Sequence, residues 1–276
     1  MMNNERSNNN EKTNWIEHTR AECPLCNGKS VNKVWSIPFG RVSDPIKVNK
    51  IKLNLYPMLN SDKVYDFYSC DDCESIYLDP VSYGGHKDDS LHYIEKMKDK
   101  SNWSGYYSRY DYFSKFIPTG SKVFLDAACA IGQYAQIAKE KGEFPWGRIV
   151  CLEYSESYVK HMNSIGMEAY KVDLHADSMG DYVKNESVDF IVFSEAFEHM
   201  GNSLLVMKNL INTLRPGGRI FFSAQALGGS LPIRPAETLY INNIGINMLC
   251  EKTGTKLVEK TDRHDRFFVV LEKTDQ

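Results

Sequence analysis

The stretch VFLDAACAIG, residues 123–132, decides the fold of this chain. It opens with an apolar run suited to a buried parallel strand, and Asp126 ends that run. The residues that follow are almost all small, so the backbone can approach a ligand closely before a helix starts at about Gln133. Glu153 ends the next apolar run, 21 residues after Gly132, where a carboxylate can accept both hydroxyls of a ribose. This order of features predicts a nucleoside-binding site in an α/β domain.

From residue 121 onward, apolar strand-like runs alternate with helical patterns. The expected strands are 123–126, 148–153, 168–172, 188–193, a run that begins at Arg219, and 267–271. The expected helices are 133–141, 155–165 with Ser155 as the N-cap, 198–214 and 238–252. Such alternation implies a doubly wound, mostly parallel sheet. Ligands bind such sheets at the carboxyl ends of the strands, near the point where strand order reverses.

Acidic residues stand at four successive strand ends of this pattern. They are Asp126, Glu153, Asp173 and Glu195. Their mutual repulsion is unfavourable unless a ligand supplies hydrogen-bond donors or positive charge. The four acids therefore strengthen the prediction of a ligand site at this edge of the sheet.

The loop and several later segments resemble the class I S-adenosylmethionine-dependent methyltransferases. The first motif of that family is D-x-G-C-G-x-G, and it is matched here at Asp126, Cys129 and Gly132. Ala128 and Ala130 replace its first two glycines, which costs about 1 kcal/mol or more wherever a positive φ is needed. The similar later segments are KVDL at 171–174, SVDFIVFSEAFEHM at 187–200 and LINTLRPGGRIFFS at 210–223. The resemblance spans residues 121–271 and implies a Rossmann-like, seven-stranded methyltransferase sheet with S-adenosylmethionine as cofactor.

The resemblance also implies a role for each candidate site residue. The amino-acid end of the cofactor would be held by Asp126, Ala127, Ala128 and Gly132. Glu153 would hold the ribose, Asp173 and Leu174 would meet the adenine, and Glu195 would lie near the methionine moiety or the substrate. His199 is the candidate general base, with packing against a neighbouring loop as the alternative. Glu198 is expected to be an acid at a helix N-terminus, and Glu237 and Tyr240 are weaker candidates for the acceptor site.

Two C-x-x-C pairs lie near the N-terminus, Cys23 with Cys26 and Cys70 with Cys73. Two such turns complete the tetrahedron of thiolates that Zn²⁺ prefers, and four thiolates leave no open position, so the predicted zinc is structural. Strand-like runs flank the second pair, as in a zinc ribbon, and an extra loop or hairpin must fill the 43 residues between the pairs. Four ordinary reduced cysteines are the alternative. The pairs also resemble a zinc knuckle that precedes bacterial methyltransferases of sugar and glycan pathways.

Composition and local pattern suggest the domain organisation. The chain has 276 residues, a net charge of −3 and no apolar run long enough to cross a membrane. Residues 1–18 read as a disordered, Asn-rich tail without a signal peptide, which predicts a cytoplasmic protein. We expect a zinc-ribbon-like subdomain over 19–82, a helical lid or linker over 83–118, and a methyltransferase domain over 119–276. The aromatic face of 103–116 either packs on the sheet or covers the ligand.

These features favour a methyltransferase acting on a small molecule, such as a sugar, nucleotide-linked sugar or glycan precursor. The absence of a strongly basic block argues against a nucleic-acid partner. One alternative is a zinc-ribbon-guided methyltransferase of RNA or protein. Another is a catalytically degenerate scaffold subunit, which the two alanines in the loop would favour.

Overall fold

The computed structural model describes residues 16–18, 22–38, 46–48, 51–53, 64–79, 81–83, 90–226, 238–263 and 266–275. Most of the predicted tail lies outside these ranges. Its last part, β1 (Ile16–His18), pairs antiparallel with β7 (Val81–Tyr83). In the described part of the chain, no helix combines the length and apolar character needed to cross a membrane.

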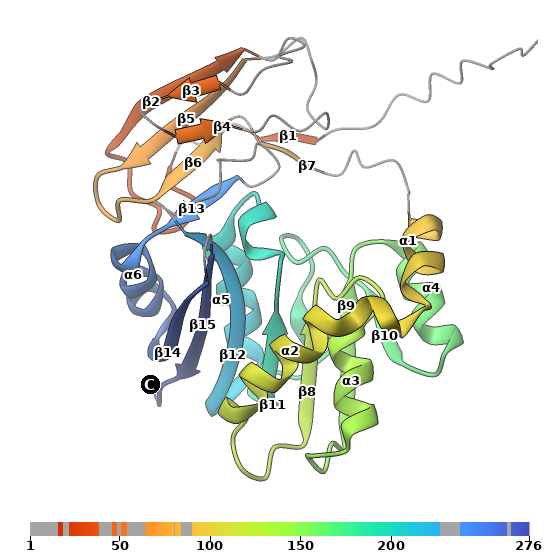
Figure 1. The fold of residues 1–276 in the computed structure, drawn as a ribbon. Coiled ribbons are helices and arrows are strands. Elements are labelled where there is room, and N and C mark those ends of the chain that lie inside the picture. Colours follow the sequence, from red (N-terminus) through yellow and green to blue (C-terminus); the bar gives the residue numbers. More distant parts are fainter. Residues whose placement is uncertain are drawn as a thin grey trace, which may run out of the picture.

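The central sheet runs β10 (Glu168–Lys171), β9 (Arg148–Glu153), β8 (Val123–Ala127), β11 (Val188–Phe193) and β12 (Leu214–Ala226), all parallel. Beyond β12 lie β15 (Arg266–Lys273) and β14 (Thr255–Arg263), which pair antiparallel. This arrangement gives the predicted seven strands (Figure 1). Strand order reverses between β8 and β11, so their carboxyl ends flank the point where such sheets bind ligands.

Helices cover both faces of the sheet. The face with Phe190 and Val192 packs against α1 (Ser90–Met97), α2 (Ser104–Phe113), α3 (Gln133–Lys141) and α4 (Glu156–Ser164). The face with Ile191 and Phe193 packs against α5 (Ser203–Thr213) and α6 (Asn243–Thr253). Because successive residues of β11 serve opposite cores, the four residues from Phe190 to Phe193 are all apolar, as in buried parallel strands.

The segment between the two predicted domains is helical, as expected. A 3₁₀ turn, Lys100–Trp103, joins α1 to α2, and a second turn, Ser114–Phe116, follows α2. The ring of Phe113 stacks on Phe190 and Phe221, with centroids 5.6 and 4.9 Å apart. This end of the aromatic face therefore packs on the sheet.

The N-terminal cysteine unit is built on a hairpin of β5 (Val64–Cys70) and β6 (Ile76–Asp79), with β2 (Val31–Pro38) beside β5. A small hairpin of β3 (Ile46–Val48) and β4 (Ile51–Leu53) lies in the long gap between the cysteine pairs, as predicted. The short strand β13 (Leu239–Ile241) pairs with β12 on one side and with β6 on the other. The two predicted units thus share one continuous sheet.

Two predicted helices were wrong at their starts. The segment predicted as a helix from 198 begins as a 3₁₀ turn, Phe197–His199, and α5 begins only after Asn202, whose side chain accepts the N–H of Leu205. The segment predicted as a helix from 238 begins as β13, and Asn242 caps α6 in the same way through the N–H of Gly245. In both cases an asparagine N-cap sets the start of the helix. Ser155 does precede α4, but its side chain makes no capping bond.

Candidate active site and metal centre

The loop after β8 contains three residues in the left-handed region. The φ angles are 51° at Ala128, 50° at Ala130 and 71° at Gly132. The N–H of Gly132 donates to the carbonyl of Cys129 at 2.8 Å, and the N–H of Cys129 donates to Leu152 in β9 at 3.3 Å. The loop therefore keeps the backbone path that glycines would take, and each alanine bears the cost of a positive φ.

Asp126 lies beneath this loop rather than on its surface. Its side chain is only 2% exposed, and Oδ2 accepts the N–H of Ala135 at 3.0 Å. That N–H belongs to the first turn of α3, where backbone donors have no partner within the helix. Burial raises the pKa of Asp126 well above its usual range. The observed contacts make Asp126 an anchor for the start of α3, and direct contact with a cofactor stays a prediction.

Glu153 links the loop to the turn that precedes α4. Its Oε2 accepts the N–H of Ala130 at 2.8 Å, and its Oε1 accepts the N–H of Ser155 at 2.9 Å. Burial raises the pKa of Glu153, and these two hydrogen bonds oppose the rise. Each carboxylate oxygen has two lone pairs, so both can still accept a bond from a ligand.

Asp173 and Leu174 differ in how accessible they are. Asp173 is half-buried, its Oδ1 accepts the N–H of His175 at 2.9 Å, and the same oxygen lies 3.3 Å from His175 Nδ1. Leu174 is buried in the core, and its carbonyl accepts a bond from the side chain of Asn209. Of the two, Asp173 is the one that the structure leaves open to a ligand.

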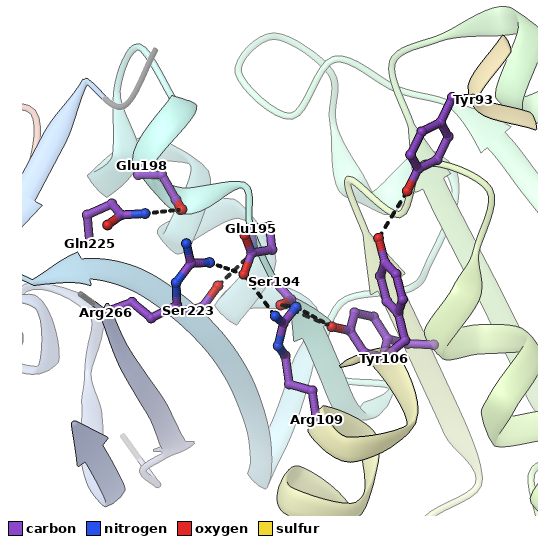
Figure 2. Close-up of polar contacts among 10 residues, drawn as sticks. Tyr93, Tyr106, Arg109, Ser194, Glu195, Glu198, Ser223, Gln225 and Arg266 are labelled. Atoms are coloured by element: carbon purple, nitrogen blue, oxygen red, sulfur yellow. Dashed lines mark hydrogen bonds and ion pairs between the residues drawn. The ribbon is translucent and has the colours of Figure 1, made fainter. Parts of the chain in front are cut away.

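Glu195 stands at the carboxyl end of β11 and contacts two arginines that the sequence patterns did not single out (Figure 2). Its Oε1 lies 3.2 Å from Nη2 of Arg109 in α2 and also contacts Nη1 of Arg266 in β15. The N–H of Glu195 donates to Ser223 Oγ at 2.7 Å. The negative charge at this strand end is therefore matched by the protein itself.

Glu198 and His199 lie in the 3₁₀ turn, outside the first turn of α5. Glu198 therefore lies in the first turn of the short 3₁₀ helix and not at the N-terminus of α5, where the predicted helix would place it. Its side chain is 1% exposed, Oε1 lies 3.5 Å from Gln225 Nε2, and Oε2 has no hydrogen-bond partner among the described residues. Burial raises the pKa of Glu198. His199 is exposed, Tyr240 is buried in β13, and Glu237 lies outside the described residues.

Tyrosines from α1 and α2 meet the helix that follows the loop. The hydroxyls of Tyr93 and Tyr106 are 3.0 Å apart, and Gln133 Nε2 donates to Tyr93 at 2.8 Å. Figure 2 shows the two tyrosine rings directed toward each other beside the site. The helical segment therefore packs on the sheet at Phe113 and reaches the start of α3 at Tyr93.

The four predicted zinc ligands form one buried cluster. All four sulfurs lie within 4.8 Å of one another, and the pairs Cys23–Cys73 and Cys26–Cys70 are each 3.6 Å apart. A tetrahedron with Zn–S bonds of about 2.3 Å has sulfur–sulfur edges of about 3.8 Å. The two knuckles have the same backbone pattern, with Asn27 and Glu74 at positive φ after the second cysteine of each pair. The donor set and its spacing fit a four-thiolate zinc ion.

The first knuckle is packed directly on the α/β domain. The carbonyl of Pro24 accepts the N–H of Leu204 in the first turn of α5 at 2.8 Å. Leu25 is fully buried, and a Cβ added to Gly245 in α6 would lie 2.9 Å from it. The knuckle thus caps α5 and packs closely against α6 at Gly245.

Comparison with known proteins agrees with this geometry. Residues 95–256 match a family model described as a methyltransferase domain. A probable S-adenosylmethionine-dependent methyltransferase of Mycolicibacterium smegmatis is 26% identical over 139 residues, which is 47% of this chain and 50% of that protein. Methyltransferase GfsG of Streptomyces halstedii is 29% identical over 205 residues, 68% of this chain and 70% of that protein.

Among solved structures, a TehB-like S-adenosylmethionine-dependent methyltransferase of Corynebacterium glutamicum has a TM-score of 0.52 at 14% identity. The match covers 67% of this chain and 98% of that one, and it shows a shared fold. The chain spans about half the length of most of the curated relatives that it matches.

Proposed function

We propose, because the chain belongs to the methyltransferase domain family, that it transfers the methyl group of S-adenosylmethionine to a small-molecule acceptor. The observation that carries this proposal is the loop at 128–132, which keeps its left-handed turns at the strand-order reversal and is tied to Glu153. When bound, the cofactor supplies an electrophilic methyl group on a sulfonium.

The residues fit the cofactor through backbone donors and carboxylates. The loop from Ala127 to Gly132 would bind the amino-acid end, and the free lone pairs of Glu153 would accept the ribose hydroxyls. Asp173, which is half-buried at the end of β10, would accept a bond from the adenine amino group. Asp126 would act from below by fixing the first turn of α3.

We further propose that the acceptor is a sugar, nucleotide-linked sugar or glycan precursor, with His199 as the base that removes its proton. His199 is exposed on the turn after β11, so an acceptor can reach it. The cysteine unit supports a small acceptor rather than RNA, because its first knuckle is buried against α5 and α6. The zinc that it would hold is structural, since four thiolates fill its coordination sphere.

Titration calorimetry of the zinc-loaded protein with S-adenosylmethionine tests this function. We expect saturable binding, weakened about tenfold or more by Glu153→Ala, because a ribose hydroxyl would lose its acceptor. Glu168→Gln is the matched control. Glu168 is the first residue of β10, so it lies at the amino ends of the strands, away from Glu153, and it pairs with Arg148. Folded, zinc-loaded protein that gives no saturable heat would contradict the proposal and favour the scaffold alternative.

The acceptor can be sought with labelled cofactor. Incubation of the protein with methyl-labelled S-adenosylmethionine and fractionated cell extract should transfer the label to a sugar-containing compound. Label found only in RNA or protein would overturn the acceptor class and leave the cofactor assignment standing.

A further inference from the structure

The contacts of Glu195 bring two arginines together at the edge of the sheet that holds the candidate site. Its single carboxylate is shared by two guanidiniums from segments far apart in the chain, Arg109 in α2 and Arg266 in β15 (Figure 2). The two arginine side chains are 20% and 15% exposed, whereas the Glu195 side chain is 41% exposed. The cations are thus held in place by their surroundings, and the carboxylate between them is the more accessible partner.

Arg109 has other contacts that hold it in position. Arg109 Nη1 donates to Tyr134 Oη at 2.7 Å and to Ser194 Oγ at 3.3 Å, and its guanidinium lies 5.5 Å from the centroid of Phe268. Because Tyr134 is in α3, these bonds connect the arginine to the helix that follows the candidate cofactor loop. Arg109 therefore stays at this edge of the sheet whether or not Glu195 is bound to it.

A third guanidinium, that of Arg263, approaches one of the rings that Arg109 contacts. Arg263 is the cross-strand partner of Arg266 in the β14–β15 hairpin, and its guanidinium lies 5.8 Å from the centroid of the Phe268 ring that Arg109 also approaches. Two guanidiniums share the one carboxylate of Glu195. The other acid that interacts with Glu195 and Arg266 is Glu198, and burial raises its pKa. An arginine fork binds carboxylate and phosphate oxygens through paired, charge-assisted hydrogen bonds.

The backbone of Glu195 has an unusual conformation. Its φ of 59° is rare for a residue with a side chain, and a strained backbone of this kind is concentrated at binding and catalytic sites. The strained residue directs its carboxylate at the arginines, although the position is otherwise open to solvent.

We propose that Arg109 and Arg266 bind an anionic group of the methyl acceptor, a phosphate or a carboxylate, and that Glu195 occupies this position until the acceptor displaces it. This inference rests on the proposed function and narrows its substrate class to acceptors that carry such a group. A nucleotide-linked or phosphorylated sugar has a phosphate, and a uronic acid has a carboxylate.

Calorimetric titration of the full, zinc-loaded chain with sodium pyrophosphate or with succinate tests the proposal. Glu195→Gln removes the competing charge, so anion binding should tighten by about three- to tenfold. Arg109→Gln and Arg266→Gln should each weaken it by about tenfold, and Arg266→Lys, which keeps the charge but loses the fork, should weaken it less. A preference for pyrophosphate assigns a phosphate, and a preference for succinate assigns a carboxylate.

Arg148→Gln is the matched control, because Arg148 also pairs with a carboxylate, that of Glu168, but at the opposite end of the strands. Anion affinity that is unchanged or weaker in Glu195→Gln would overturn the proposal, and so would an equal loss in Arg148→Gln and Arg266→Gln. The melting temperature and zinc content of each variant establish that it folds. Titration of the same proteins with S-adenosylmethionine separates the methyltransferase proposal from the anion-site proposal. Absence of cofactor binding would contradict the methyltransferase function and leave the anion site standing.

Discussion

The two alanines of the loop allow a quantitative test of its backbone. Ala128 and Ala130 have φ angles of 51° and 50°, a region that costs an L-residue about 1–2 kcal/mol. Glycine removes this cost but adds about 0.4–1 kcal/mol of chain entropy to the unfolded state. The net expectation is that each alanine-to-glycine change raises the free energy of unfolding by about 0.5–1 kcal/mol. The double variant should therefore gain about 1–2 kcal/mol, which corresponds to roughly 3–6 °C in melting temperature.

Urea denaturation of the zinc-loaded protein measures this effect, with Ala127→Gly as the control. Ala127 lies in β8, is 1% exposed and is not among the residues with positive φ. Glycine there should destabilise the protein by about 0.5–1 kcal/mol. If Ala128→Gly and Ala130→Gly destabilise the protein as Ala127→Gly does, the left-handed turns are absent and the reasoning fails.

The same variants separate stability from cofactor affinity. Identical φ angles at the two alanines in the free and in the cofactor-bound protein would make their strain a cost of folding and not of binding. We therefore expect the affinity of the double variant for S-adenosylmethionine to change by less than about threefold. A much larger gain in affinity would show that the loop reaches its left-handed turns only on binding.

Three further predictions concern other residues. Burial raises the folded-state pKa of Glu198, so its protonated form is favoured and stability falls as pH rises above the unfolded value of 4.5. In urea denaturation, the free energy of unfolding of Glu198→Gln minus that of the parent should therefore be larger at pH 7 than at pH 4.5. A difference that does not depend on pH would contradict this. Cys26→Ser should abolish zinc binding measured by elemental analysis and lower the melting temperature, whereas Cys250→Ser on α6 should keep the metal. His199→Ala should lower kcat about 10²–10⁴-fold with cofactor affinity unchanged, and a variant as fast as the parent would remove His199 from the chemistry.

The parts of the fold that follow from local pattern were predicted well. The strands 148–153 and 188–193 and the helix 133–141 have the predicted bounds. Strong signals mark each of them, since both strands contain a run of four apolar residues, and the helix lies between Gly132 and Gly142, both of which adopt positive φ.

The wrong and missing elements depend on tertiary contacts. Leu239–Ile241 is a strand because β6 and β12 supply partners on both sides, and no pattern within three residues reveals them. The short apolar run therefore looked like the first turn of a helix. The same holds for Asn202, whose capping role depends on the chain reversing at the preceding 3₁₀ turn.

In the candidate site, too, local pattern predicts some features, and tertiary contacts determine the others. The acids at the strand ends were found from their spacing, but their partners were not. Arg109 and Arg266 are separated by more than 150 residues, and both contact Glu195. The buried state of Asp126 and Leu174 is likewise set by packing that the sequence pattern does not display.

The pairing of β6 with β13 has a consequence for how the chain is made. The cysteine hairpin leaves the ribosome before the α/β domain, but the strand that covers the free edge of β6 follows about 160 residues later. At about 5–20 residues per second, that edge waits roughly 8–30 s for its partner. Exposed strand edges pair readily with other chains. Slow translation therefore lengthens the period in which nascent chains can associate, and conditions that slow elongation should increase the insoluble fraction of this protein.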